Sequence, residues 1–573
     1  MLYHDFLRFE LLKIINSPIF SKRMLKSLDN SLFNIEIPNN KKFGDVSTNI
    51  AMVFFKKVGL SPPVLAKKIS EKLKKNRLID KIDVIEPGFI NIFFKDKFWH
   101  EQLNILLKEI KNYKYVIRKK KICIEFVSAN PTGPMHIGHA RGAVLGDTVA
   151  SILEEVGHKV TREYYINDAG EQIKKLIKTI IFHQKNKSKE IEDDLYPGDY
   201  LKEVSLKVKT TRNSRLENGN KNLEKIVVDF IMRDIKKDLV DVRVKHHSFI
   251  SEKSISTKEN IDNLKKKLDD ERLIYFGYQE KPRSIKDKNW EKQEQLLFRS
   301  RSLGDESDRA LLKPNGELTY FMSDIIYHQN KIDRNFDVMI NIWGADHSGY
   351  VKRLENAIGA VNRSKKYNFE IKLTALVNLL ENKKIIKMSK RQGNYITMRE
   401  VAGKVGIDVL RFMMISRNAD KKIDFDFEIV KQKSKDNPVF YIQYAHARCM
   451  SIIKTFNKTF DLSLDKDKDF FDFDLSNLRL DEEKILIRNL CNFFNVIISS
   501  ATYYEPHRVS NYLFELSKDF HAYWGLGKNN LSKKIIIESN LDLSKSRLVL
   551  VFAISKVIKK GLDLLKIECP ESM

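Results

Sequence analysis

Cysteine is scarce in this sequence, and long apolar runs are missing. The four cysteines among the 573 residues are scattered, with no CxxC pair, which argues against a disulfide framework and against a structural metal such as zinc. No window offers the roughly 18 uncharged apolar residues that a membrane helix requires. The first ten residues include Asp5 and Glu10 and lack the apolar core of a signal peptide. We therefore expect a cytoplasmic protein without a membrane partner.

Positive charge, in contrast, is present in excess. Lys and Arg number 102 against 76 Asp and Glu, a formal net charge of +26, which favours a polyanionic partner. A lysine-rich genome would produce the same excess, and runs such as residues 265–267 fit that explanation, so charge alone leaves nucleic-acid binding open. The length corresponds to three or four domains of the usual ~150 residues. The hydrophobic fraction of 42% is sufficient for packed cores.

The first 115 residues combine helical stretches with one alternating apolar segment. Residues 82–94 alternate in the manner of strands, and Pro87-Gly88 at their middle indicates a hairpin turn. We predict a small N-terminal α/β domain over residues 1–115.

A second region, residues 116–435, begins with a strand, a Pro/Gly-rich loop, a helix and another strand. This order is a βαβ unit, the beginning of a Rossmann-type parallel sheet with helices on its faces. The expected strands are 121–127, 159–166, 336–343 and 371–377, and the first helix is 140–157. Residues from about 185 to 300 are highly charged and weakly patterned, which predicts an insertion of helices and loops. From 436 to 573, apolar residues recur at helical spacing, which predicts an all-helical domain.

The first chemical motif is His-Ile-Gly-His at 136–139, between a predicted strand and the helix that follows. A helix N-terminus attracts phosphate through its free backbone N–H groups and its dipole. Gly138 allows close approach of a nucleotide, and His136 and His139 can donate to phosphate oxygens. An ordinary helix start with surface histidines would look the same in isolation. The position of the motif after the strand favours a nucleotide site.

The second motif is Lys-Met-Ser-Lys at 387–390, with Gly393 soon after. Two lysines in a loop can close on a triphosphate and neutralise the leaving pyrophosphate. In a chain with 102 basic residues, such a pair by itself is equally well explained as a solvated charge run. The two motifs together are far more specific than either.

The combination of HIGH and KMSK motifs resembles the paired signature of class I aminoacyl-tRNA synthetases. The flanking segments 125–142, 164–172, 343–350 and 437–448 look like arginyl-tRNA synthetase. The resemblance implies ATP-dependent ligation of L-arginine to tRNA(Arg) through an arginyl-adenylate, for protein synthesis. It also implies a tRNA-contacting N-terminal domain, a Rossmann-type catalytic domain and a helical anticodon-binding domain.

By this resemblance, ATP lies against both motifs and against a Gly-x-Asp element that holds the ribose. The implied ATP-binding residues are His136, Gly138, His139, Gly344, Asp346, Lys387, Met388, Ser389 and Lys390, among which His136, His139, Lys387 and Lys390 are catalytic. The arginine carboxylate would attack the α-phosphate in line, so that positioning and charge stabilisation do the catalysis. Mg²⁺ would arrive with ATP.

Arginine as a substrate requires a binding site for its guanidinium group. Its guanidinium stays charged and binds best to a carboxylate through two parallel hydrogen bonds. Tyr320 and Asp324 lie four residues apart, on one face if this segment is helical; alternatively, Asp324 only caps or solvates a helix. The arginine-binding residues that the resemblance implies are Glu125, Ser128, Asn130, Tyr320, Asp324 and His347.

The C-terminal region contains aromatic residues beside an arginine. Tyr441 and Tyr444 share a helix face near Arg448, and stacking plus a guanidinium suits unpaired RNA bases. Aromatic residues at this spacing are also typical of a helix core. Tyr523 and Met573 are weaker candidates for the same role.

Three other functions stay open at this point. A small-molecule nucleotidyltransferase also uses HxGH, but it has no use for a helical RNA-facing domain. A silent tRNA-binding scaffold has no reason to keep both histidines and both lysines. A class I synthetase for another amino acid would differ in the pair Tyr320 and Asp324. We expect a monomer. One departure from the family pattern is the segment 245–252, which lacks the usual Phe-Asp before its glutamate.

Overall fold

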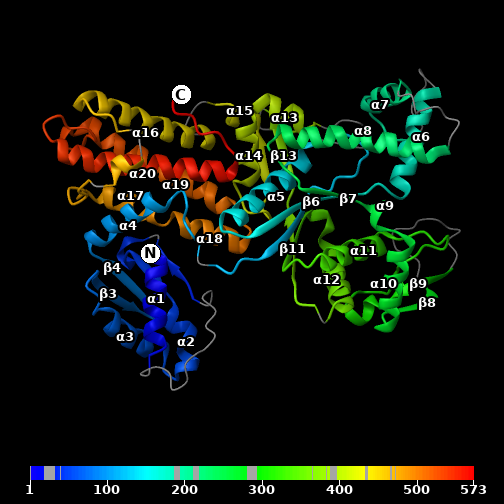
Figure 1. The fold of residues 1–573 in the computed structure, drawn as a ribbon, viewed down its shortest axis with the longest axis horizontal. Helices are drawn as coiled ribbons and strands as arrows, with labels where there is room; N and C mark the ends of the chain where they lie inside the picture. The colour runs from blue at the N-terminus through cyan, green and yellow to red at the C-terminus, as the bar shows by residue number, and fades with distance from the viewer. Residues whose placement is uncertain are drawn as a thin grey trace.

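The structure is a computed structural model, and it describes residues 2–17, 33–38, 40–115, 117–185, 194–210, 219–279, 293–363, 365–381, 384–386, 396–432, 437–464, 467–471 and 473–573. Figure 1 shows the N-terminal domain in blue below the orange and red C-terminal helices, with the central sheet and its insertions in the middle and on the right.

The N-terminal domain is an antiparallel sheet with helices packed against it. The strand order is β1–β2–β4–β3, and β3 pairs with β4 on either side of Pro87 and Gly88, which confirms the predicted hairpin. The elements are α1 (Tyr3–Ile15), β1 (Ile35–Glu36), η1 (Lys41–Phe43), β2 (Val46–Thr48), α2 (Ile50–Val58), α3 (Pro62–Leu73), β3 (Ile79–Ile85), β4 (Phe89–Phe94) and α4 (Asp96–Glu109).

The central region is built on a parallel sheet of order β12–β11–β5–β6–β7 among the described residues. Its strands are β5 (Lys121–Phe126), β6 (Lys159–Ile166), β7 (Ser248–Ser251), β11 (Val338–Gly344) and β12 (Asn368–Thr374). The chain leaves β5 towards β6 and later returns to the other side of β5 as β11. Ligands of such sheets bind at the carboxyl ends of the strands, where the order reverses. In this sheet that place is the end of β5 next to β11.

The two faces of the sheet bury different cores because side chains alternate along a strand. Ile122, Ile124 and Phe126 of β5 belong to the core shared with α5 (Ile137–Glu155). Cys123 belongs to a second core, which it shares with α11 (Tyr320–Asp333) and α12 (Ser348–Val361). A Cβ at Gly146 of α5 would lie 2.2 Å from the Phe126 ring, so only glycine permits this helix–strand approach.

The segment between 185 and 300 differs from the expectation in one respect. It contributes a strand of the main sheet, β7, which pairs with β6, and a small antiparallel sheet, so the prediction of helices and loops alone is wrong there. Four-residue β7 lacks the length that makes a strand visible in sequence. The other elements of the segment are α7 (Asp199–Thr210), α8 (Gly219–Asp241), α9 (Glu252–Ile255), α10 (Lys258–Asp270), β8 (Ile274–Tyr278) and β9 (Glu294–Phe298). The segment is preceded by α6 (Glu171–Lys185) and followed by η2 (Ser300–Leu303) and β10 (Arg309–Ala310).

The short helix η3 (Ala345–His347) joins β11 to α12. Another small sheet and several short helices connect the central region to the C-terminal domain. They are β13 (Val377–Glu381), β14 (Lys384–Ile385), α13 (Met398–Val405), α14 (Ile407–Ile415), β15 (Ile423–Asp426) and α15 (Phe427–Val430). From residue 438 onward the described residues form helices without strands, as predicted. These are α16 (Pro438–Phe460), η5 (Asp467–Phe470), α17 (Asp481–Cys491), α18 (Phe493–Tyr503), α19 (His507–Asn529), η6 (Leu531–Lys533) and α20 (Leu541–Leu565).

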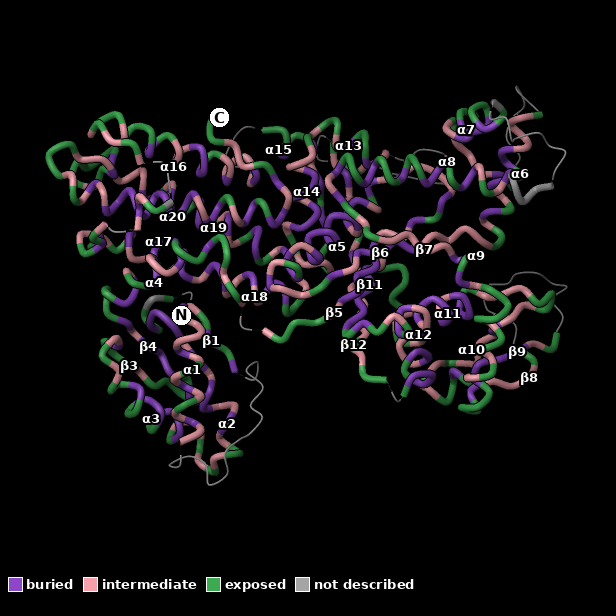
Figure 2. The backbone as a smooth tube through the Cα atoms, in the orientation of Figure 1, coloured by how far each residue is buried: buried purple, intermediate pink, exposed green. Residues whose placement is uncertain are grey.

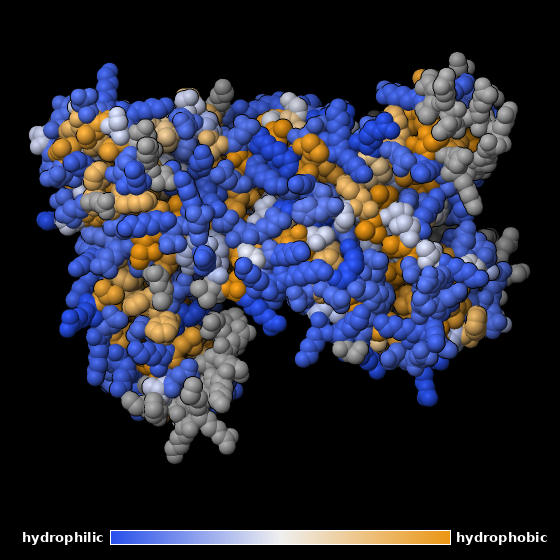
Figure 3. All heavy atoms as spheres, in the orientation of Figure 1, coloured by the Kyte–Doolittle hydropathy of each residue, from blue (hydrophilic) through white to orange (hydrophobic). Residues whose placement is uncertain are grey.

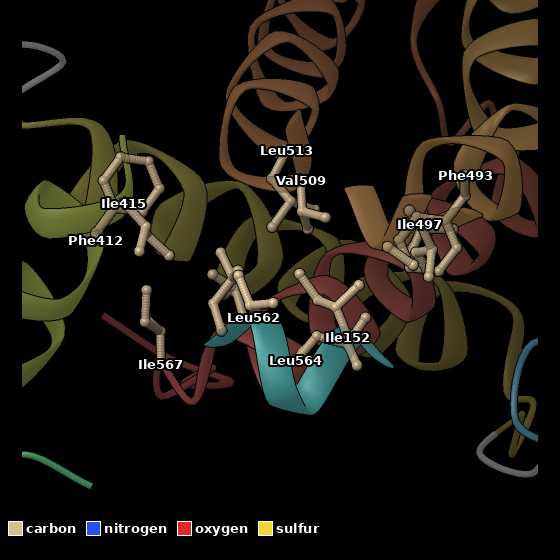
Figure 4. Packing of buried hydrophobic residues seen from close by; sticks show 14 of the residues in the cluster. Ile152, Phe412, Ile415, Phe493, Ile497, Val509, Leu513, Leu562, Leu564 and Ile567 are labelled. Atoms are coloured by element: carbon tan, nitrogen blue, oxygen red, sulfur yellow. The ribbon is translucent and has the colours of Figure 1, made fainter. Parts of the chain in front are cut away.

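The helical domain packs directly against α5, the helix that begins at the HIGH motif. Figure 4 shows Ile152 of α5 beside Leu562 and Leu564 of α20, with Leu513 of α19 close by. Buried charges reinforce this junction: the carboxylate of Asp147 accepts from Arg411 at 3.0 Å and from Lys566 at 2.6 Å. Figure 2 shows how continuously α5 and α20 are buried.

One stretch of the described helices, Asp481–Tyr503, is long and apolar enough to cross a bilayer by length and composition. It consists of α17 and α18, and half of the 18-residue window that meets this criterion is buried inside the protein. The face shown in Figure 3 is predominantly hydrophilic. We interpret the stretch as core helices of the bundle.

Candidate active site

The HIGH motif forms the N-terminus of α5, at the carboxyl end of β5. His136 is the N-cap: its Nδ1 accepts from the Gly138 backbone N–H at 3.1 Å, and the His136 N–H donates to Nδ1 of His139 at 3.3 Å. The two rings stack with centroids 3.8 Å apart. A Cβ on Gly138 would lie 2.9 Å from the His136 ring, so glycine is required there. The first three backbone N–H groups of α5 therefore all have partners within the protein, so an anion at this helix start would be met by the helix dipole and the two imidazole rings.

The HIGH segment also pairs with the chain that follows the KMSK motif. The Met398 N–H donates to the Met135 carbonyl at 2.9 Å, and the Ile137 N–H donates to the Ile396 carbonyl at 3.2 Å. Lys387, Met388, Ser389 and Lys390 themselves lie outside the described residues. The fold nevertheless brings the end of that loop against the HIGH motif.

The Gly-x-Asp element lies at the neighbouring strand end. Gly344 is the last residue of β11, and Asp346 follows in η3, exposed, with its carboxylate 3.6 Å from Nε2 of His347. A Cβ on Gly344 would collide with the Asp346 carboxylate at 2.3 Å. Since β11 adjoins β5, these residues and the HIGH motif share one edge of the sheet.

Tyr320 and Asp324 lie on one helix, α11, which Thr319 caps. Tyr320 is exposed. The Asp324 carboxylate accepts from the Tyr350 hydroxyl at 2.6 Å. Burial, together with the charges of Glu125 and Glu252, raises the pKa of Asp324 to about 7. A cation would favour the ionised form, and an arginine guanidinium supplies one.

Glu125 is buried, and each of its two carboxylate oxygens accepts a hydrogen bond. It accepts from Ser128 Oγ at 2.9 Å and from Lys331 Nζ at 2.6 Å. Lys331, fully buried, also donates to Asn341 Oδ1 at 2.9 Å. Ser128 has a positive φ of 41° and Val127 one of 70°, a strained conformation for residues with a side chain.

The hydrogen bonds continue from Lys331 to the backbone of Asp324. Asn341 Nδ2 lies 2.8 Å from His328 Nε2, and His328 Nδ1 lies 2.7 Å from the Asp324 carbonyl. Burial keeps the pKa of His328 well below its ordinary value, so the ring is neutral and can donate at one nitrogen and accept at the other. These bonds link the Glu125 carboxylate to the backbone of Asp324, whose own carboxylate is bonded separately to Tyr350.

Sequence reasoning missed Lys331, His328, Tyr350 and Glu252. A signal existed for the first two, because Asp324, His328 and Lys331 follow one another at helical spacing on a face that had to be buried. Asn130, which was predicted, accepts from the Asn167 side chain at 2.8 Å and lies on the same loop as Ser128. His347 is exposed and contacts the Trp343 ring at 5.7 Å between centroids.

Comparisons with known proteins fit this geometry. Residues 102–429 match the class I tRNA synthetase (R) catalytic domain, residues 12–94 the arginyl-tRNA synthetase N-terminal domain and residues 442–573 the DALR anticodon-binding domain. The chain belongs to the arginyl-tRNA synthetase family. Members of this family are class I enzymes that charge tRNA with arginine.

Two arginine–tRNA ligases show how close the family relationship is. That of Wolbachia pipientis (strain wPip) is 42% identical over 544 residues, and that of Pelagibacter ubique is 40% identical over 552; each alignment covers 94% of both chains. The solved arginyl-tRNA synthetase of Thermus thermophilus shares the fold, with a TM-score of 0.73 at 18% identity over 100% of both chains.

The anticodon-binding domain of this family member contains an aromatic cluster around Arg448. The Arg448 guanidinium lies 4.5 Å from the Tyr444 ring centroid and 3.8 Å from that of Trp524. Its Nη1 is 2.6 Å from His521 Nδ1, and the Tyr441 ring stands 4.5 Å from the His521 ring. His521 and Trp524 were not predicted, because they come from α19 and meet α16 only in the fold.

The other two tRNA candidates differ in their exposure. Tyr523 is fully buried, and its hydroxyl donates to Glu483 at 3.0 Å, so it is placed in the core of the bundle. Met573, at the chain end, is exposed.

Proposed function

We propose that this chain ligates L-arginine to tRNA(Arg) through an arginyl-adenylate, with ATP at the end of β5 and arginine under α11. ATP contacts His136, Gly138 and His139 and, in the neighbouring loops, Gly344, Asp346 and residues 387–390. The observation that carries the proposal is the meeting of two features at one sheet edge. A phosphate-directed helix N-terminus lies there beside a buried pair of carboxylates, Glu125 and Asp324.

Arginine in this proposal lies with its guanidinium towards Asp324, Glu125 and Tyr320. Its α-amino and α-carboxyl groups face Ser128, Asn130 and His347. The arrangement supports this orientation because the acids are on the α11 side of the sheet, whereas Ser128 and Asn130 are on the loop that leads to the HIGH motif. The arginine carboxylate then points towards the α-phosphate.

Catalysis in this proposal needs no protein nucleophile. The carboxylate attacks the α-phosphate in line, and His136, His139, Lys387 and Lys390 stabilise the charge that develops on the phosphates and the leaving pyrophosphate. Within the described residues, no group of three or more His, Cys, Asp or Glu side chains is placed to hold a metal ion. In this proposal Mg²⁺ arrives with ATP, bound to its phosphates.

The tRNA spans the molecule in this proposal. Its anticodon meets Tyr441, Tyr444 and Arg448, with Met573 nearby, and its outer corner meets the N-terminal domain, residues 1–115. The catalytic domain comprises residues 116–435 and the anticodon-binding domain 436–573. We further propose that the enzyme acts as a monomer in the cytoplasm, which size-exclusion chromatography with light scattering would test for the oligomeric state.

The decisive experiment is exchange of pyrophosphate into ATP, with each amino acid in turn and with or without tRNA. We expect exchange with arginine alone among the amino acids. Exchange that also requires tRNA would place tRNA within the active-site assembly. Exchange with another amino acid, or none under any condition, contradicts the proposal.

A further inference from the structure

Tyr165, the penultimate residue of β6, carries a buried hydroxyl whose bonding the described residues leave incomplete. The residue is 4% exposed, and its Oη has no hydrogen-bond partner among the described residues. Neighbouring buried tyrosines are satisfied: Tyr327 donates to Glu163 at 2.9 Å and Tyr350 to Asp324 at 2.6 Å. A buried polar group without a partner is unfavourable. Such a group is expected where a ligand completes the bonding.

The ring of Tyr165 packs against a neighbouring ring that is itself fixed by hydrogen bonds. It stacks on Tyr327 with centroids 4.1 Å apart and planes 16° apart. Tyr327 is fixed by Glu163, which is bound in turn by both terminal nitrogens of Arg334 at 2.5 and 2.8 Å. The Tyr165 backbone N–H donates to Ser128 Oγ at 3.1 Å. This support leaves the hydroxyl little freedom to find another partner.

The hydroxyl lies among the acids of the arginine pocket. After burial, the charges of Glu252, Asp324, Glu125 and Asp168 raise the pKa of Tyr165. Tyr165 in turn contributes to the raised pKa of Tyr350, which donates to Asp324. The pairing of β6 with β7 sets Tyr165 beside Ile250, two residues before Glu252. The phenol is therefore neutral, and its oxygen can accept a hydrogen bond.

A guanidinium presents five N–H donors, and one carboxylate takes only two of them in parallel. The remaining donors need acceptors in the same buried space. We propose that Tyr165 is a specificity-determining residue that contacts the substrate, its hydroxyl oxygen accepting a hydrogen bond from the guanidinium of arginine. This inference rests on the proposed function, whose pocket it extends by a residue outside the predicted set of arginine-binding residues.

The test is Tyr165→Phe, which removes the hydroxyl and keeps the stacked ring. We expect the arginine KM in tRNA aminoacylation to rise about tenfold or more, the usual effect of losing a hydrogen bond to a charged group. The kcat and the ATP KM stay unchanged. Agmatine, which keeps the guanidinium and lacks the carboxylate, should lose the same factor as a competitive inhibitor. The Tm of the free protein stays the same or rises, because the deleted hydroxyl has no partner to lose.

Tyr367→Phe is the matched control. Its hydroxyl donates to the Ile358 carbonyl at 3.1 Å on the same side of the sheet, so the variant should lower Tm slightly and leave the arginine KM unchanged. An unchanged arginine KM in Tyr165→Phe would overturn the proposal, and so would unchanged inhibition by agmatine. A fall in Tm together with a raised ATP KM would assign Tyr165 a purely structural role instead.

A second variant separates this inference from the pocket as a whole. If Asp324→Asn raises the arginine KM and Tyr165→Phe does not, only the role of Tyr165 is wrong. If neither variant changes it, the arginine pocket itself is misplaced and the proposed function of these residues falls as well.

Discussion

The nucleotide half and the arginine half of the active site are built in different ways. The nucleotide half uses backbone and partly exposed side chains from short segments: a helix N-terminus at His136 and a Gly-x-Asp turn at Gly344. The arginine half uses buried side chains that three elements bring together: Glu125 from β5, Asn341 from β11 and Lys331 from α11. Phosphate charge is met by local dipoles, whereas a buried guanidinium needs carboxylates kept ionised at a distance from water. We therefore expect mutations in the arginine half to change stability or the arginine KM, and mutations in the nucleotide half to change kcat.

The largest expected effect comes from Lys331→Met in the arginine half. It leaves Glu125 as a buried, unpaired charge, which destabilises a protein by about 3–5 kcal/mol. Denaturant unfolding measures this directly. Lys365→Met is the control, because the Lys365–Asp333 pair is solvent-exposed and such pairs contribute at most about 1 kcal/mol. Equal stability of the two variants would show that the Glu125 network is not a stability element.

In the nucleotide half, His139→Asn should lower kcat. Removing one preorganised donor to developing charge typically lowers kcat by about 10²–10³, while the arginine KM and the Tm stay unchanged. Steady-state kinetics of pyrophosphate exchange checks this split. His183→Asn, on α6 outside the site, should have no effect. A raised arginine KM with normal kcat in His139→Asn would contradict the division into two halves.

Arginine binding should depend on pH through Asp324. Its pKa is raised to about 7, and only the ionised carboxylate pairs with the guanidinium, so affinity is full above pH 7 and is lost as pH falls. The arginine KM is expected to fall about tenfold from pH 6 to pH 8, because the competent fraction of the site rises by that factor. Asp324→Asn should have a higher KM that no longer changes with pH in this range. A flat profile in the unmodified protein would show that Asp324 is already ionised at pH 6.

The smallest effect is expected far from both halves, at Arg448. Arg448→Lys keeps the charge but loses the planar stacking between Tyr444 and Trp524, a contribution of about 0.7–1.4 kcal/mol. The tRNA KM should rise about threefold to tenfold, with pyrophosphate exchange at saturating tRNA unchanged. Arg508→Lys, whose guanidinium lies over the Tyr503 ring at 4.9 Å on another surface, should not change it.

The same contrast explains which residues could be predicted. The HIGH motif, the Gly-x-Asp turn and the parallel βαβ unit are local, so a few consecutive residues determine them. For Tyr320 and Asp324, the spacing of four residues predicted a shared helix face, whereas their arginine-binding role was implied by the resemblance to the family. Tyr350, Glu252 and Tyr165 carry no local signature of this kind, because the role of each depends on a partner far away in the chain. Helical spacing could place Lys331 on the face of Asp324, but not its pairing with Glu125. The strand β7 was missed because four residues give too short an alternation to recognise.

The sequence by itself determined the family, the nucleotide motifs, the helical C-terminal domain and the carboxylate on α11. Those features depend on short-range geometry: helix periodicity, glycine conformation and the order of strands and helices. The tertiary structure alone decided that Glu125 is bound by a buried lysine and that Tyr523 is in the core while Trp524 contacts Arg448. It alone decided that the Tyr165 hydroxyl is buried without a hydrogen-bond partner among the described residues. Burial and pairing are properties of side chains from distant segments that meet in space, and burial is what makes a charge or a hydroxyl demand a partner.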